Sequence, residues 1–272
     1  AMTRLVIHAG FHKTGTTSVQ TLLRENRDLL SEHLAIYLRP DFEELAETCR
    51  RYCLNPKPLR LANVGRAAQA FFGTLAAGSP RPILMSSEDL SGLMPGRRDL
   101  ATYAAAPHLM RVICEAARAR FGKPLDLTLF FSTREADSWL RSAWWQHLRG
   151  TRMTENLDSY VQSAREAADF DTVLQAVQST TRGAVVTALP LEESRDLPQG
   201  PLTPLLELAG LPDAGRARIE MRPPDNVRPD LGLEPAFLAL NRSGLHMKDL
   251  AEIKARILKM TATRQRRDND PD

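Results

Sequence analysis

The residues best suited to chemistry lie in one short segment near the start of the chain, Gly10 to Thr17. This segment reads Gly-Phe-His-Lys-Thr-Gly-Thr-Thr and follows the apolar run Leu5–Ala9. Its two glycines allow sharp turns that bring backbone N–H groups towards an anion, and the start of a following helix adds positive potential. Further donors come from Lys13, Thr14, Gly15, Thr16 and Thr17. The segment, which we call the anion loop, therefore predicts a site for a phosphate-like group.

The anion loop differs from the nucleoside-triphosphate loop G-x-x-x-x-G-K-[ST] in the place of its lysine. Both glycines are present, Gly10 and Gly15, but Thr16 stands where that lysine belongs. Lys13 lies inside the loop instead, which we expect to place its ammonium near the bridging region of a bound anhydride. A small-molecule kinase that uses ATP and Mg²⁺ is an alternative, but it leaves the missing lysine unexplained.

A second candidate for anion binding follows another strand-like run, Leu125–Ser132. Arg134 comes just after this run, and Ser142 lies eight residues later in an expected helix. Open α/β sheets bind ligands at the carboxyl ends of their strands, and a planar guanidinium suits phosphate oxygens. Alone, each residue is more often a surface or helix residue. Together with the anion loop, they predict a second phosphate-binding pair.

Three residues are candidates for a general base. Glu88 follows the strand-like run Ile83–Ser86, so we expect it at the same edge of the sheet as the anion loop. Its alternative role is to start or cap a short helical turn. His12, inside the anion loop, is either a base or a further phosphate donor, unless it only fills space. His147, in the helix after the second anion site, is the third candidate.

The segment His12–Gln20 resembles the 5′-phosphosulfate-binding loop of sulfotransferases, commonly P-K-[ST]-G-T-T. The form with histidine in place of proline resembles bacterial members more than animal cytosolic ones. Arg134 and Ser142 match the spacing of the arginine and serine that hold the 3′-phosphate of the donor in that family. The family's proline after the arginine is absent. A third family element, R-K-G, has no counterpart beyond Arg222 and the stretch Asn226–Arg228.

The resemblance implies an enzyme, a sulfotransferase that uses 3′-phosphoadenylyl sulfate (PAPS). Such an enzyme transfers a sulfuryl group to a hydroxyl or amine of a small-molecule or glycan acceptor and leaves adenosine 3′,5′-bisphosphate. It implies that Lys13 stabilises the charge that grows on the bridging oxygen, with no metal required. Several carbohydrate sulfotransferases use a glutamate base, whereas the small-molecule class more often uses histidine. A non-catalytic nucleotide-binding module on the same scaffold is a third interpretation.

Short apolar runs alternate with longer helical patterns along the chain. This order predicts an α/β fold of three layers, α/β/α, with a central, mostly parallel sheet similar to that of P-loop NTPases. The expected strands are Leu5–Ala9, Ile83–Ser86, Leu125–Ser132 and Ala184–Leu189. The expected helices are Thr17–Leu30, Glu43–Cys53, Val64–Ala77, Leu100–Phe121, Ala136–Arg149, Leu157–Ala167, Phe170–Thr180, Pro204–Ala209, Leu233–Arg242 and Lys248 to about Thr261.

The 272 residues, 43% of them hydrophobic, predict a single domain over 2–263, with 264–272 as a flexible tail. A net charge of +3 suits an anionic ligand and does not favour nucleic acid.

Three cysteines cannot all pair, and the first strand begins too early for a signal peptide, so we expect a reduced, cytoplasmic protein. We expect no membrane span, because no run approaches roughly 18 apolar residues.

The acceptor is not predictable from the sequence, but its surroundings are. Four segments are expected to form the acceptor wall: Pro40–Cys53, Asn55–Val64, Thr151–Asn156 and Met221–Pro229. Of these, Met221–Pro229 is either a mobile arm near the ligand or an inert surface loop. Trp139, Trp144 and Trp145 are expected in the core, although they also suit stacking on adenine or an acceptor ring.

Overall fold

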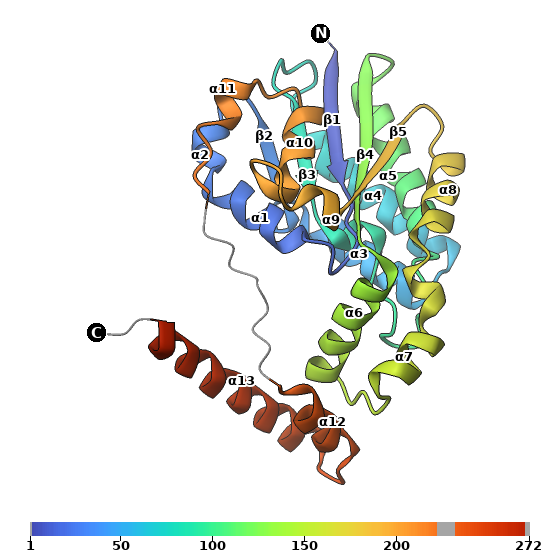
Figure 1. Ribbon diagram of the computed structural model, residues 1–272. Helices are drawn as coiled ribbons and strands as arrows, with labels where there is room; N and C mark the ends of the chain where they lie inside the picture. Colours follow the sequence, from blue (N-terminus) through green and yellow to red (C-terminus); the bar gives the residue numbers. More distant parts are fainter. Residues whose placement is uncertain (1, 222–231, 270–272) are drawn as a thin grey trace. The chain divides into compact units, whose positions relative to one another are not determined.

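The computed structural model describes residues 2–221 and 232–269 (Figure 1). The chain divides into two compact units. Unit 1 consists of Ala1–Ala136 and Glu166–Pro223, and unit 2 of Asp137–Arg165 and Pro224–Asp272. The single domain expected over 2–263 stays a prediction.

Unit 1 is built on a five-stranded sheet in which every neighbouring pair of strands is parallel. The strands are β1 (Thr3–His8), β2 (Ala35–Leu38), β3 (Ile83–Ser86), β4 (Leu125–Thr133) and β5 (Val185–Pro190). Their order across the sheet is β2-β3-β1-β4-β5, so β1 lies between β3 and β4. Helices lie on both sides of this sheet (Figure 1), and the predicted α/β fold with a parallel sheet is confirmed.

One face of the sheet forms a core with the helices that follow the anion loop and β5. Val6, Leu84 and Phe130 project from the three central strands into a buried apolar cluster. The cluster includes residues of α1 (Thr16–Glu25), α2 (Arg27–Leu30) and α10 (Thr203–Leu208). Because these helices bury an apolar stripe against the sheet, the start of α1 is held at the end of β1.

The other helical layer of unit 1 contains α3 (Glu43–Leu54), α4 (Pro58–Thr74), α5 (Ala106–Phe121) and α8 (Phe170–Thr180). Within this layer α4 packs against α3 and α5, and α8 packs against α5. Short elements complete the unit: η1 (Arg39–Phe42), η2 (Glu88–Ser91), η3 (Arg165–Ala168, apart from its first residue), α9 (Leu191–Ser194), η4 (Gly200–Leu202) and α11 (Asp213–Arg216).

Unit 2 contains α6 (Ala136–Gly150, apart from its first residue), α7 (Leu157–Ser163), α12 (Glu234–Arg242) and α13 (Met247–Asn269). Lys254 Nζ donates to the carbonyl oxygens of Leu148 and Thr151, at 2.8 and 2.7 Å. Asn241 Nδ2 also donates to the carbonyl of Leu148, at 3.1 Å. The last carbonyls of a helix have no partner within the helix, so side chains of α12 and α13 satisfy the end of α6.

Several predicted boundaries were wrong. The strand β2 was not expected. The single helix expected over Thr17–Leu30 is two helices, broken at Asn26, whose side chain bonds to the carbonyl of Leu22 and to the backbone of Glu220. The helix expected from Leu100 begins at Ala106.

Two of the segments expected to form the acceptor wall are largely helical, and the helix expected over Glu43–Cys53 is confirmed as α3. Pro40–Cys53 forms most of η1 and α3, and Asn55–Val64 contains the start of α4, because Pro58 is tolerated in a first helical turn. The final helix continues to Asn269, beyond the expected end near Thr261. The predictions on 222–229 lie outside the described residues.

Candidate functional site

Three loops of unit 1 meet at the carboxyl edge of its sheet. The anion loop is tied to β4 by two backbone bonds, from Ala9 N to Phe130 O at 3.1 Å and from Phe11 N to Ser132 O at 2.9 Å. The loop after β3 is tied to β1 by the bond from Ser87 N to His8 O, at 3.1 Å. The structure therefore brings the predicted residues after β1, β3 and β4 to one place.

The anion loop turns sharply through three residues with a left-handed backbone. These are Gly10 (φ 102°), Lys13 (φ 65°) and Gly15 (φ 90°). At Gly15 the left-handed φ favours glycine, and a Cβ atom there would also lie 2.8 Å from Leu191 Cδ1, which would have to shift. Lys13 has a Cβ and still holds a positive φ, a conformation that costs free energy and is common at functional sites. The predicted strand–loop–helix is present, with α1 beginning at Thr16.

The three threonines of the anion loop have different surroundings. Thr14 is fully buried, and its hydroxyl donates to the carbonyl of Phe11 at 2.5 Å, which braces the turn. Thr16 is also buried, whereas Thr17 is exposed at the start of α1. Thr17 is therefore the threonine whose side chain is open to solvent in this loop.

Arg134 lies beside the anion loop. Its Nη1 donates to the carbonyl oxygen of Lys13 at 3.1 Å, and its Nε lies 3.8 Å from Glu192 Oε1. Glu192 also accepts a bond from the backbone N–H of Glu135, at 3.2 Å. Ser142 belongs to α6 in unit 2, so its pairing with Arg134 stays a prediction.

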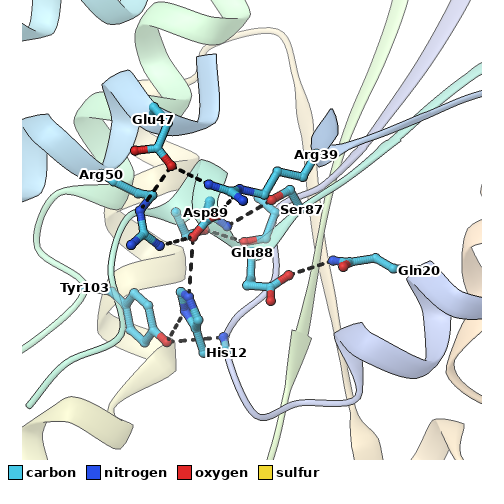
Figure 2. Close-up of polar contacts among 11 residues, drawn as sticks. His12, Gln20, Arg39, Glu47, Arg50, Ser87, Glu88, Asp89 and Tyr103 are labelled. Carbon is cyan, nitrogen blue, oxygen red and sulfur yellow. Dashed lines mark hydrogen bonds and ion pairs between the residues drawn. The ribbon is translucent and has the colours of Figure 1, made fainter. Parts of the chain in front are cut away.

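Glu88 lies directly against the anion loop. A Cβ atom placed on Gly10 would lie 2.8 Å from Glu88 Cβ and 2.9 Å from Glu88 Cα. The carboxylate of Glu88 accepts a hydrogen bond from Gln20 Nε2 of α1, at 2.6 Å (Figure 2). The expected short helical turn is present as η2, but its cap is Ser87, whose hydroxyl accepts from Asp89 N. The carboxylate of Glu88 is thus not used to cap the turn.

His12 is held by two residues that sequence analysis did not select, Tyr103 and Asp89 (Figure 2). The hydroxyl of Tyr103 lies 3.1 Å from His12 Nδ1 and accepts the His12 backbone N–H at 3.2 Å. The other ring nitrogen, Nε2, lies 3.8 Å from Asp89 Oδ1. Asp89 follows directly after Glu88, which was a usable signal, whereas Tyr103 lies outside every recognised motif.

Asp89 is a buried carboxylate with two arginine partners. Arg39 Nε lies 2.8 Å from Oδ2, and Arg50 Nη1 donates to Oδ1 at 3.1 Å. Burial by itself would raise the pKa of Asp89, but the contact with His12 and the guanidinium of Arg50 outweigh it and lower the pKa. Asp89 therefore carries its negative charge at neutral pH.

His8 and His147 are both fully buried. The ring nitrogens of His8 lie 2.8 Å from the hydroxyls of Ser86 and Ser132, beneath the anion loop. Burial lowers the pKa of His8 from 6.5 to about 3, so the ring is neutral and its role is structural. His147 lies on α6, in unit 2.

The tryptophans of α6 are buried, as expected for core residues. In unit 2, Trp145 stacks on Phe237 with ring centroids 5.5 Å apart, and Trp144 Nε1 donates to the carbonyl of Glu155 at 2.9 Å.

Among the residues that the structure describes, no group of three His, Cys, Asp or Glu side chains is placed to hold a metal ion. Within 2–221 and 232–269, no helix has the length and apolar character to span a membrane.

Comparisons with known proteins place this chain in no family. No protein-family model matches the sequence, and no curated protein matches it at a significant level. The functional argument therefore depends on the residues at the carboxyl edge of the sheet and on their geometry.

Proposed function

We propose that this chain is a sulfotransferase that transfers the sulfuryl group of PAPS to a hydroxyl or amine acceptor. The observation that carries the proposal is the meeting of Lys13, Glu88 and Arg134 at one edge of the sheet in unit 1. They follow three neighbouring strands, β1, β3 and β4. This combination supplies a cation for the reacting anhydride, a carboxylate for the acceptor proton and a second cation for a further phosphate.

The anion loop supports the donor half of the proposal. A buried parallel strand, a loop with left-handed turns and a helix start are the features that bind phosphates in P-loop proteins, with which we group this fold. Lys13 belongs to the loop itself, which suits charge that grows on the bridging oxygen of a phosphosulfate. A preorganised donor of this kind contributes about 3–4 kcal/mol to transition-state stabilisation.

The proposed step is an in-line displacement at sulfur. The acceptor oxygen or nitrogen forms a bond to sulfur while the bond from sulfur to the bridging oxygen breaks. The electron pair of that bond goes to the 5′-phosphate of the leaving adenosine 3′,5′-bisphosphate. Glu88 takes the acceptor proton, a role that contributes 10²–10⁴-fold in rate for a well-placed base. Because the Cα and Cβ atoms of Glu88 lie against Gly10 of the anion loop, we expect its carboxylate to lie near the donor.

Arg134 supports the choice of a donor with a second phosphate. Its guanidinium contacts both the loop carbonyl of Lys13 and the carboxylate of Glu192. A 3′-phosphate is a stronger partner than a single carboxylate, because it offers more acceptor oxygens and more charge. ATP lacks that phosphate, so this arginine favours PAPS over ATP. Three buried free thiols, Cys49, Cys53 and Cys114, support a reducing, cytoplasmic location.

The first prediction concerns binding of adenosine 3′,5′-bisphosphate. We expect it to raise the thermal midpoint, because a ligand at 100 times its dissociation constant stabilises the native state by about 2.7 kcal/mol. Lys13→Ala and Arg134→Ala should each weaken binding at least tenfold by calorimetric titration. Lys123→Ala and Arg182→Ala are matched controls, because both residues are exposed and precede β4 and β5 at the opposite edge.

The same titration with ATP and Mg²⁺ separates the proposal from the kinase alternative. Stabilisation by the bisphosphate alone supports the sulfotransferase, and stabilisation by ATP with Mg²⁺ alone would favour a kinase. Wild-type affinity in both Lys13→Ala and Arg134→Ala would remove the donor-site assignment.

A further inference from the structure

We infer that Tyr103 and Asp89 are positioning residues that lock His12 and thereby set the shape of the anion loop. Neither residue belongs to the motifs that define the proposed donor site. The inference rests on the proposed function only in its consequence for donor binding. Its core is a continuous chain of polar contacts, from Arg39 and Arg50 through Asp89 and His12 to Tyr103 (Figure 2).

The hydroxyl of Tyr103 has two contacts with the same residue. It accepts the backbone N–H of His12 at 3.2 Å, so its own proton is available for His12 Nδ1 at 3.1 Å. With Nδ1 as an acceptor, the neutral ring carries its proton on Nε2, which faces Asp89 Oδ1 at 3.8 Å. One tautomer of His12 therefore satisfies all three contacts.

The acid that faces His12 is itself held in place. Asp89 is 7% exposed and receives Arg39 of η1 and Arg50 of α3 on its two oxygens. Glu47 of α3 contacts the same two guanidinium groups, which fixes them relative to Asp89. A buried charge with two cationic partners and a histidine has little freedom to move. The network therefore connects the loop to two elements that are distant from it in sequence.

The anchored histidine lies next to the residues that matter for the donor. Phe11, just before His12, packs on Tyr103 with centroids 4.5 Å apart and stacks on Phe170 at 4.7 Å. Lys13, just after it, holds the left-handed backbone conformation. Tyr103 thus contacts the loop through its ring and through its hydroxyl. Removal of the hydroxyl alone would release His12 while leaving the aromatic packing intact.

The test is Tyr103→Phe, with Tyr52→Phe as the matched control. Tyr52 is also a buried tyrosine of unit 1, and its ring lies against His108 rather than the anion loop. We expect Tyr103→Phe to weaken bisphosphate binding about tenfold, while the thermal midpoint of the ligand-free protein stays within a few degrees of wild type. Tyr52→Phe should leave the affinity unchanged. Equal affinities in Tyr103→Phe and wild type would overturn the inference.

A second measurement reports on His12 without any ligand. Nitrogen NMR of histidine-labelled protein should show His12 with a proton on Nε2 and an accepting Nδ1, and Tyr103→Phe should move the Nδ1 signal. Asp89→Asn should move the Nε2 signal, and if this variant does not fold, Tyr103→Phe still decides. A proton on Nδ1 in the wild type would overturn the inference. If the NMR results are as expected but the wild type does not bind the bisphosphate, the positioning stands and the proposed function fails.

Discussion

At the scale of single residues, His8 shows how burial determines the role of a histidine. Its two ring nitrogens lie 2.8 Å from the hydroxyls of Ser86 on β3 and Ser132 on β4, the two strands that flank β1. A neutral ring donates through one nitrogen and accepts through the other, which suits two hydroxyl groups. A protonated ring would bring an unpaired charge into the core below the anion loop.

His8 predicts an acid-sensitive fold. The folded-state pKa, about 3, is below the ordinary value of 6.5. Between these pH values the unfolded chain binds a proton that the folded chain does not, so the free energy of unfolding falls as the pH falls through this window. For His8, this effect lowers the free energy of unfolding by about 2 kcal/mol at pH 5 relative to pH 7.5.

Urea unfolding at the two pH values measures this loss. His8→Leu should be less stable overall but should show a pH dependence that is smaller by that amount. The exposed His33 serves as the control, since His33→Gln should keep the wild-type dependence. An unchanged pH dependence in His8→Leu would show that His8 does not cause the acid sensitivity.

Glu88 predicts a separation between donor binding and transfer. Glu88→Gln keeps the shape of the side chain and leaves its neighbour Gln20 in place, but it removes the carboxylate that we propose as the base. We expect bisphosphate affinity to stay within about threefold of wild type, and transfer of radiolabelled sulfur to an acceptor found by screening to fall at least 100-fold. Glu32→Gln, at an exposed position, is the control. Intact transfer in Glu88→Gln would mean that another residue is the base.

At the scale of elements, the anion loop depends on close approach between β1 and the loop after β3. Gly10 has a φ of 102°, and a Cβ atom there would collide with backbone and side-chain atoms of Glu88. The local sequence pattern predicts the glycine, but the neighbour that requires it, Glu88, belongs to η2, which is distant in the sequence. The loop and the candidate base are therefore one structural feature.

Gly10→Ala tests this feature. The strained φ and the 2.8 Å contact should destabilise the fold by about 1–3 kcal/mol and displace Glu88, which lowers both stability and bisphosphate affinity. Gly65→Ala is the control, because Gly65 lies within α4 and an added methyl group there meets nothing within 4 Å. That control should be more stable by about 0.5–1 kcal/mol, as helix propensity predicts. A Gly10→Ala variant with wild-type stability and affinity would contradict the close approach.

At the scale of the whole molecule, the chain leaves unit 1 after Ala136, forms α6 and α7 in unit 2, and returns to unit 1 at Glu166. The alternation of strands and helices predicts the α/β sheet correctly, but it contains no signal of this division. Unit 2 is assembled from two separate pieces of the chain, and contacts such as Lys254 to the end of α6 create it. Such contacts are properties of packing, and local periodicity does not report them.

The parts of the candidate site that depend on local structure could be predicted from the sequence. Apolar runs predict strands β1, β3 and β4, and the residues after them must share an edge because parallel strands end together. Lys13, Glu88 and Arg134 were selected as candidates in this way. The contacts that hold His12 and Asp89 beside them required the folded structure, since these partners come from elements with no motif. Tyr103 and His12 are 91 positions apart in the sequence, and Arg50 and Asp89 are 39 positions apart. Local sequence patterns govern backbone conformation, whereas such contacts depend on how the completed helices pack against the sheet.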